Sequence, residues 1–350
     1  MFHGAMEDAV VPLVRVRRAG IEESLHRGAF VLVEGDRVVL ARGDPRRVVF
    51  FRSTSKPLQA LVGVTSGAAD RFGFTDEELA IAAGSHSATG EQLAVVRRML
   101  EKAGLGEGDL RCVGHYSITP EVAHLQHLET DAPPAIWSNC SGKHTLMLAT
   151  AKHLGLATAT YTEPDHPVQQ TIRRHLATLG GVALDAVEIG IDGCGVPAFA
   201  LPLERIARAL ARFGSPEGLP ADLAGACRRV AAAMDAHPDR VGGPGRFDTD
   251  LMASCRHVLL AKAGAEGVHG WVAPERRLAF AVKVEDGHDR GYRLLVVEIL
   301  ERLGLYTAEE AAAVRERQCD PVVRNRLGEA VGRQEVVVED LEALDAPHRV

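Results

Sequence analysis

The hydrophobic and polar positions of this chain change their period along its length, and the changes divide it into three parts. The first part holds three strand-like runs: residues 11–17, 27–34 and 37–42. Gly35 and Asp36, between the last two runs, are typical of a tight hairpin turn. The last part is an expected antiparallel strand pair followed by a long helix: residues 268–272, 278–284 and 291–303.

Helical spacing dominates the middle of the chain. The predicted helices are residues 75–83, 91–103, 145–154, 167–179, 203–213, 219–236 and 250–261. Other stretches interrupt them: 115–134 is expected to be irregular, 187–191 a buried strand and 241–245 a glycine-dense loop.

This order of strands, helices and strands predicts an α+β protein, and its 350 residues exceed what one core usually holds. The two ends of such a chain most simply share one sheet. We therefore expect a sheet-containing lobe from residues 1–52 and 255–350 and a mainly helical lobe from residues 53–254. An active site would lie between the two lobes.

Composition narrows the class of protein. Hydrophobic residues make up 46% and charged residues 25%, as in ordinary globular proteins, and the net charge of −7 argues against nucleic-acid binding. No apolar run approaches the roughly 18 residues of a membrane span, and no secretory signal precedes the first strand. The six cysteines are sparse and irregularly spaced, which indicates reduced thiols. We expect a cytoplasmic protein without a membrane partner.

The first candidate for chemistry follows a strand-like run at 48–51. Ser53 and Lys56 are three residues apart, and Pro57 marks the first turn of a helix. This spacing places the serine and the lysine on one side of the helix, where a neutral amine could accept the hydroxyl proton. Alone the pattern is weak, because a capping serine and a solvated lysine would look the same.

Two later segments parallel other parts of serine acyl-transfer enzymes. Such enzymes of the penicillin-recognising class add a serine on a loop and a Lys-x-Gly before a sheet strand. Here Ser85 and Ser87 follow a predicted helix, and Lys262 begins a segment that directly precedes the strand at Val268. A helix cap and an exposed charge are the structural alternatives.

A second group of reactive residues lies in two glycine-containing loops. Cys140, Lys143 and His144 stand in the first loop, and Asp192 and Cys194 in the second. Two thiolates and a nitrogen donor suit Zn²⁺. The spacing lacks C-x-x-C, so ordinary buried cysteines remain the alternative. The other cysteines are expected to be packing residues: Cys112, Cys227, Cys255 and Cys319. The glycine loop lacks a phosphate-binding motif, which argues against nucleotide binding.

Five segments in order resemble a known family. They are Arg52-Ser53-Thr54-Ser55-Lys56-Pro57, Gly84-Ser85-His86-Ser87, Trp137-Ser138-Asn139-Cys140-Ser141-Gly142-Lys143-His144, Asp192-Gly193-Cys194-Gly195-Val196-Pro197 and Lys262-Ala263-Gly264-Ala265-Glu266-Gly267. Together they resemble the L-asparaginases of the Rhizobium etli type, also called class 3 or the asparaginase II family. The resemblance extends roughly from Val11 to Leu305. The tail from about Asp320 lies outside it and is expected to be weakly structured after Pro321.

This resemblance implies a serine-β-lactamase/glutaminase-like fold, a homodimer, and hydrolysis of L-asparagine to L-aspartate and ammonia. It implies two catalytic serine-lysine pairs: Ser53 with Lys56, and Ser85 with Lys262. It also implies a zinc site formed by Cys140, Lys143 and Cys194. The residues expected to bind the substrate are Arg52, His144 and Asp192.

Other functions remain open at this point. A glutaminase, a penicillin-binding enzyme or an esterase on the same scaffold would keep the serine-lysine pairs. A zinc-dependent binding or sensor protein would keep the cysteines and have no turnover. The sequence also leaves open which serine is acylated and whether a metal hydroxide takes part.

Overall fold

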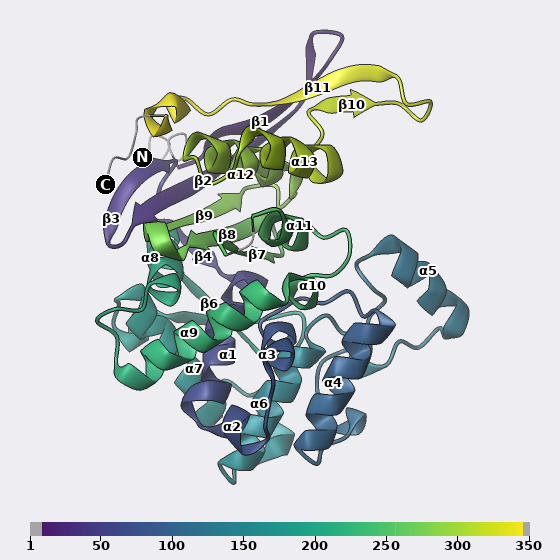
Figure 1. The fold of residues 1–350 in the computed structure, drawn as a ribbon, viewed down its shortest axis with the longest axis vertical. Helices are drawn as coiled ribbons and strands as arrows, with labels where there is room; N and C mark the ends of the chain where they lie inside the picture. Colours follow the sequence, from purple (N-terminus) through teal and green to yellow (C-terminus); the bar gives the residue numbers. More distant parts are fainter. Residues whose placement is uncertain (1–8, 256, 346–350) are drawn as a thin grey trace, which may run out of the picture.

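The computed structural model describes residues 9–255 and 257–345, and an eight-stranded antiparallel sheet forms its upper part in Figure 1. The strand order is β10-β11-β1-β2-β9-β8-β7, and β3 pairs with β2 beside this path. The strands are β1 (Val11–Arg18), β2 (Ile21–Glu34), β3 (Arg37–Arg42), β7 (Leu260–Gly264), β8 (Val268–Ala273), β9 (Leu278–Val284), β10 (Val322–Arg324) and β11 (Ala330–Val336). Both ends of the chain therefore contribute to one sheet, which confirms the predicted α+β class.

The long strand β2 is the centre of the sheet. It pairs with β1 and then with β3, and β9 pairs with its second half, from Gly28 to Glu34. Five consecutive side chains, Ala29 to Val33, are fully buried. Successive side chains on a strand face opposite sides, so both faces must be covered here. Helix α12 (Arg290–Arg302) and helix α8 (Leu203–Gly214) both pack against β2 and β9 and provide that cover.

The remaining helices form the lower part of the molecule in Figure 1. They are α1 (Lys56–Thr65), α2 (Ala68–Arg71), α3 (Asp76–Ala82), α4 (Gly90–Lys102), α5 (Pro120–Glu129), α6 (Ser141–His153), α7 (Pro167–Gly180), α9 (Ala221–Ala236) and α10 (Pro238–Val241). Helix α11 (Phe247–Ser254) packs against β7 of the main sheet. Helix α13 (Ala308–Gln318) lies beside α12. Among the described residues, no helix combines the length and the apolar character that crossing a membrane requires.

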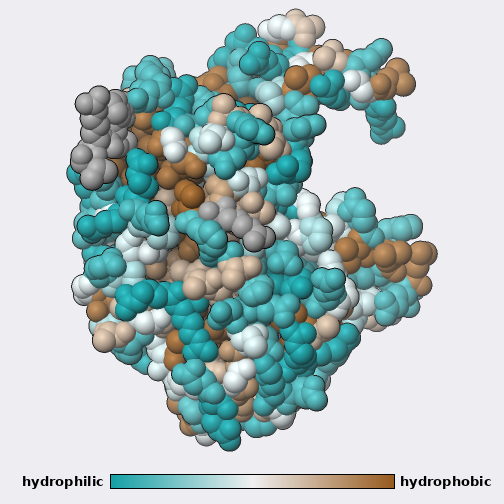
Figure 2. Space-filling view, viewed as in Figure 1, coloured by the Kyte–Doolittle hydropathy of each residue, from teal (hydrophilic) through white to brown (hydrophobic). Residues whose placement is uncertain are grey.

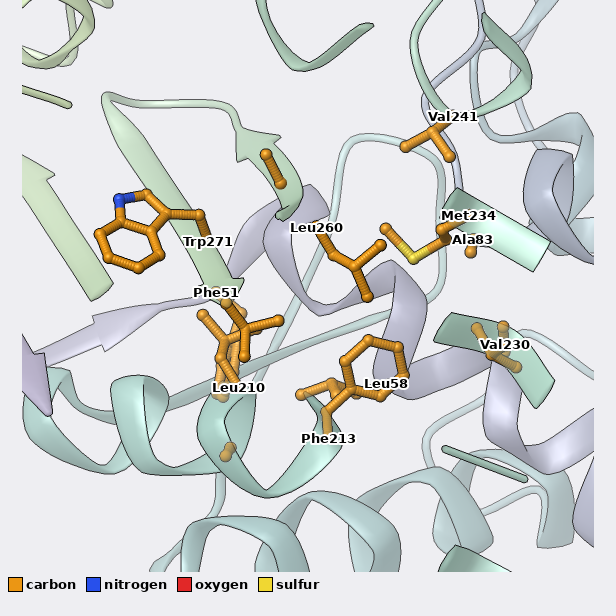
Figure 3. Close-up of a cluster of buried hydrophobic side chains, with 14 of the residues drawn as sticks. Phe51, Leu58, Ala83, Leu210, Phe213, Val230, Met234, Val241, Leu260 and Trp271 are labelled. Carbon is orange, nitrogen blue, oxygen red and sulfur yellow. The ribbon is translucent and has the colours of Figure 1, made fainter. Parts of the chain in front are cut away.

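Helix α1 is the buried axis of the helical part. It packs against α6, α7 and α9, and every residue from Lys56 to Gly63 is buried. Phe51 and Leu58, on either side of the segment that begins α1, belong to a hydrophobic cluster with Leu260 and Trp271 of the sheet (Figure 3). This cluster fixes the start of α1 against the sheet.

A second, three-stranded sheet leads into α1. It consists of β4 (Val48–Phe50), β6 (Pro197–Pro202) and β5 (Glu188–Ile191), in that order. The sequence predicted buried strands around 48–51 and 187–191. Both strands are present, but they are buried only in part, because Val48 and Phe50 are about half exposed and Ile191 is exposed. These strands lie at the edges of a small sheet, where one side chain in two has no cover.

Three further expectations differ from the structure. The predicted helix over 250–261 is α11, which ends at Ser254, and residues 260–264 form β7 instead. Leu260 and Ala261 are apolar enough for either state, and pairing with β8 decides between them. The stretch 115–134 was expected to be irregular but contains α5. That helix exposes Leu125 and Leu128, so it shows no amphipathic pattern.

The C-terminal tail is the third correction. Strands β10 and β11 follow Pro321, and β11 pairs with β1 from Val336 to Gly332. The tail is therefore part of the main sheet. Its pairing partner lies about three hundred positions earlier in the chain, and no local pattern signals such a pairing. The two-lobe boundaries stay a prediction.

Candidate active site

The segment that carries Ser53 is a tight turn between the small sheet and α1. Residues 52–55 form a 3-10 turn, and α1 begins at Lys56. In a 3-10 turn residues i and i+3 lie on the same side, so Ser53 and Lys56 face one way although only Lys56 is in the α-helix. Arg52 adopts a left-handed backbone conformation with a φ of 50°. Backbone strain of this kind is common at functional sites.

Lys56 points from this turn toward Ser85. Its Nζ atom donates a hydrogen bond to Ser85 Oγ at 2.9 Å and another to the backbone oxygen of Asn139 at 3.2 Å. The lysine is buried, and burial lowers its pKa, with a further decrease from the Lys143 ammonium and an opposing effect from Cys140. The structure thus brings Lys56 to the second serine.

Ser85 is fixed by the backbone that follows α3. Its backbone N–H donates to the Val241 oxygen at 2.7 Å. Gly84 has to be a glycine, because a Cβ atom there would lie 2.6 Å from the Arg240 oxygen and 2.7 Å from the Val241 oxygen. The close approach of these two backbone segments keeps the Ser85 hydroxyl at the Lys56 amine.

Lys262 lies on β7, within a buried group of charges. Its Nζ atom is 3.5 Å from an oxygen of Asp248, and His269 Nε2 lies 3.2 Å from the other oxygen of the same carboxylate. All three side chains are buried. Burial lowers the pKa of Lys262 to about 8, although Asp248 acts in the opposite direction. Burial raises the pKa of Asp248, but Lys262 and His269 outweigh it and hold that pKa well below its usual range.

The two predicted serine-lysine pairs are only partly assembled as hydrogen bonds. Among the described residues, no hydrogen bond joins Ser53 to Lys56 or Ser85 to Lys262. Lys262 donates instead to the oxygen of Ala263 at 2.7 Å. The Lys262 backbone is nevertheless tied to the first turn, because Thr54 Oγ1 donates to the Lys262 oxygen at 3.1 Å. Both pairings stay predictions.

The two cysteine loops meet through Lys143 and Cys194. Lys143 Nζ donates to Cys194 Sγ at 3.3 Å, and all three side chains of the predicted zinc site are buried. Cys140 Sγ lies 3.1 Å from Asn139 Oδ1. The neighbouring Cys194 thiol and the Lys56 and Lys143 ammoniums hold the pKa of Cys140 well below its usual value, against the effect of burial. Burial lowers the pKa of Lys143, but the sulfurs of Cys194 and Cys140 outweigh it, and the net shift is upward.

Whether these residues suit a metal depends on Lys143. Among the described residues, no three His, Cys, Asp or Glu side chains are grouped to hold a metal ion. A metal at the two cysteines would therefore need the lysine amine, deprotonated, as its third protein ligand. Two sulfurs and one nitrogen agree with the donor preference of Zn²⁺, and the remaining position would be open. The donor set therefore fits zinc provided that Lys143 is deprotonated, and the metal would have to reverse the upward pKa shift that the cysteines cause.

The three predicted substrate-binding residues lie in different surroundings. Arg52 donates to Asp192 Oδ1 through two nitrogens, at 3.1 and 3.2 Å, and both side chains are partly buried. His144 is fully buried in α6, and its Nδ1 atom lies 2.6 Å from the hydroxyl oxygen of Tyr161. Burial lowers the pKa of His144 well below its usual value, so this imidazole is neutral.

A cavity of about 600 Å³ opens at the two serines. Ser53, Ser85 and Asn139 line it from the helical part, and Ala263 and Gly264 from β7. The first residues of α5 also belong to the lining, and Figure 2 shows the molecule hollowed on the side from which α5 projects. The size is typical of a small-molecule site.

Four residues at or beside this cavity were missed by sequence reasoning: Asn139, Arg246, Asp248 and His269. Asn139 stands inside a recognised motif, so a role could have been assigned to it. The β7–β8 hairpin places Ala263 opposite His269, and an antiparallel register of this kind could have suggested His269 as a neighbour of Lys262. Nothing in the local sequence singles out Arg246 or Asp248.

Comparison with known proteins gives a family match over most of the chain. A family model described as L-asparaginase II matches residues 14–336, which extends the expected resemblance to include β10 and β11. No curated protein sequence matches the chain. A β-lactamase structure from Mycobacterium bovis is similar at 14% identity and a TM-score of 0.38, with 83% of this chain and 94% of that chain covered. A provisionally assigned β-lactamase from Bacteroides dorei is similar at 14% identity and a TM-score of 0.38, with 74% and 85% covered.

Proposed function

This chain belongs to the L-asparaginase II family, and we propose that it hydrolyses L-asparagine to L-aspartate and ammonia through an ester with Ser53. The observation that carries the mechanism is the 2.9 Å contact between Lys56 and Ser85 at a cavity that both Ser53 and Ser85 line. The same amine follows Ser53 by three residues, so we propose that it serves both hydroxyl groups.

Acylation begins when the Ser53 oxygen attacks the side-chain amide carbon of asparagine. The Lys56 amine accepts the hydroxyl proton, and the C–N bond breaks as the amide nitrogen receives a proton through the Ser85 hydroxyl. Ammonia leaves, and an aspartyl ester remains on Ser53. The Ser53 backbone N–H, at the start of its turn, has no partner within the turn and is available to the negative oxygen of the transition state.

Deacylation uses the same groups in reverse. A water molecule loses a proton to Lys56 and attacks the ester carbon, and the Ser53 oxygen recovers a proton as L-aspartate leaves. Lys262, ion-paired with Asp248 and linked to the turn through Thr54, keeps positive charge beside the site. That charge favours the oxyanion in both steps.

Zinc, held by Cys140, Lys143 and Cys194, would supply a Lewis-acid contact that orients the substrate. Arg52 and Asp192 would hold the loop that carries Cys194, because their ion pair connects that loop to the turn of Ser53. The substrate-binding roles of Arg52, Asp192 and His144 stay predictions; His144 is neutral and buried in α6. The homodimer and the cytoplasmic location stay predictions.

Ammonia release tests this function. Purified zinc-loaded protein should release ammonia from L-asparagine and much less from L-glutamine, and brief incubation with substrate followed by peptide mapping should find the aspartyl ester on Ser53. Equal or faster turnover of L-glutamine would make the protein a glutaminase. No turnover of either amide, with zinc bound, would leave a zinc-binding protein without this activity.

A further inference from the structure

The glycine-dense loop at residues 242–245 is built against the Ser85 segment. Ser87 Oγ donates to the Gly242 oxygen at 3.3 Å, and Ser85 N–H donates to Val241 just before the loop. Gly243 has a φ of 134°, and a Cβ atom there would lie 2.5 Å from Ser87 Oγ. Only glycine allows this approach. The loop therefore has a fixed position relative to the second serine.

This loop delivers Arg246 to the cavity. Arg246 directly precedes α11, and its backbone N–H donates to the Gly243 oxygen at 3.2 Å. Its side chain lines the cavity of about 600 Å³ that contains Ser53 and Ser85, and also an adjoining cavity of about 330 Å³. The guanidinium is thus held at the substrate cavity by a rigid backbone.

Arg246 has no partner of its own among the described residues. Its side chain makes no hydrogen bond and no ion pair, and its Nη1 atom is buried without a partner. Burial lowers its pKa from the ordinary value of 12.5, but an arginine stays charged at neutral pH. A buried charged donor without a partner is costly, and a bound anion would remove that cost.

The acids near Arg246 are engaged elsewhere. Asp248 contacts Lys262 and His269, and Asp289 is ion-paired with Arg293. Arg293 lines the same two cavities, but it also bonds Gln318 and lies over the Phe247 ring. Of these two arginines, only Arg246 makes no side-chain hydrogen bond or ion pair to any described residue.

We propose that Arg246 binds the α-carboxylate of the substrate. This inference rests on the proposed function and specifies its substrate class: free asparagine rather than asparagine within a peptide chain. A guanidinium binds a carboxylate through two parallel N–H···O bonds, which fixes the orientation of the ligand as well as its position. Inside a peptide the same carboxyl group is a neutral amide, and Arg246 would remain unpaired.

Ligands that differ only in this carboxylate test the proposal. Isothermal titration of the full-length protein with L-aspartate and with β-alanine, which lacks the α-carboxylate, should show much tighter binding of L-aspartate. Arg246→Gln should weaken L-aspartate binding about tenfold to a hundredfold and leave β-alanine within about twofold. Arg246→Lys should recover part of the loss. Arg293→Gln, which removes the same charge from the same wall, should change both ligands in parallel.

The outcomes separate this proposal from the activity itself. If the wild-type protein hydrolyses L-asparagine while Arg246→Gln keeps its affinity for L-aspartate, the carboxylate site is wrong and the function stands. A parallel weakening of both ligands in Arg246→Gln also overturns the site, because it indicates general damage. Absence of asparagine turnover in the wild type counts against the function, and the two binding constants still decide whether Arg246 recognises a carboxylate.

Discussion

Two buried lysines beside the cavity are neutralised in different ways. Lys262 is paired with a carboxylate, Asp248, that also holds His269 and the backbone N–H of Ala263. Lys143 is paired with sulfur, through Cys194 and the neighbouring Cys140. A carboxylate is ionised throughout the physiological pH range. A thiol is ionised only where its neighbours lower its pKa.

The difference indicates what each cluster can do. The carboxylate cluster, formed by Lys262, Asp248 and His269, needs no partner from outside the protein. Its carboxylate keeps a fixed negative charge beside β7. In the sulfur cluster, the pKa values of Lys56 and Lys143 are shifted in opposite directions, and so are those of Cys140 and Cys194. Ionisable groups whose pKa values are pushed apart are typical of acid–base chemistry and of metal sites. The sulfur cluster is therefore the side on which substitutions should have the larger effects.

The largest expected effect is on the proposed nucleophile, Ser53, and on Lys56, which neighbours the sulfur cluster. Ser53→Ala should lower kcat by about a thousandfold or more, because the covalent route loses its attacking oxygen. Lys56→Ala should be comparably severe, since groups that act as one unit are not additive. Steady-state ammonia release measures both.

Ser55→Ala is the matched control for Ser53→Ala. Ser55 belongs to the same turn, but its hydroxyl donates to the Arg52 oxygen and does not line the cavity. Its loss should cost less than about tenfold. If Ser53→Ala kept more than a tenth of the wild-type rate, Ser85, which already contacts Lys56, would be the better nucleophile.

The second largest expected effect is the loss of zinc, which would distinguish the sulfur cluster from the carboxylate cluster. The protein should contain roughly one zinc per chain, and Cys140→Ser or Cys194→Ser should each remove it and weaken substrate binding. Cys227→Ser and Cys255→Ser are the controls, because burial raises the pKa of each of those thiols to about 12 and keeps them neutral. Elemental analysis of the four variants measures the metal.

A chelated protein provides the opposing outcome. If zinc-free protein that cannot rebind the metal showed unchanged affinity for L-asparagine, the two cysteines would be packing or redox residues. The sulfur cluster and the carboxylate cluster would then differ only in the charges of their groups and not in metal binding.

Much of the fold could be predicted where the signal is local. The hairpin around Gly35 and the strand pair 268–272 with 278–284 follow from alternating side chains and turn residues, and both are present. The pairing of β11 with β1 joins the two ends of the chain and has no local signature. The run at Leu260 fits helix or strand equally, and its state depends on β8.

The same difference between local and tertiary signals decides which parts of the candidate site could be predicted. Ser53 and Lys56 are close in sequence, so one turn of helix predicts that they share a side. The contact of Lys56 with Ser85 depends on how α1 and α3 pack, and the contact of Lys262 with Asp248 on how α11 meets β7. Those neighbours are set by tertiary structure, which explains why Asp248, His269 and Arg246 were missed.

The smallest expected effect is a shift in pH dependence that probes the carboxylate cluster. Lys262 has a pKa of about 8, and Asp248 is the anion that keeps it from falling further. Because the charge of protonated Lys262 is proposed to favour the oxyanion, kcat/KM should fall as the pH rises through about 8. Asp248→Asn should then move this limb toward lower pH by about one unit, because the lysine loses its proton more easily. Asp250→Asn is the control, because this carboxylate lies on the same helix but contacts Gln318 instead, and it should leave the limb in place.

The pH dependence of stability gives an independent test of the Lys262 pKa. Between about pH 8 and the ordinary lysine pKa of 10.5, the unfolded chain binds a proton that the folded chain does not. The Lys262 contribution to stability should therefore rise with pH in that window. A limb that stays in place in Asp248→Asn would show that Lys262 does not control the rate, and the carboxylate cluster would be purely structural.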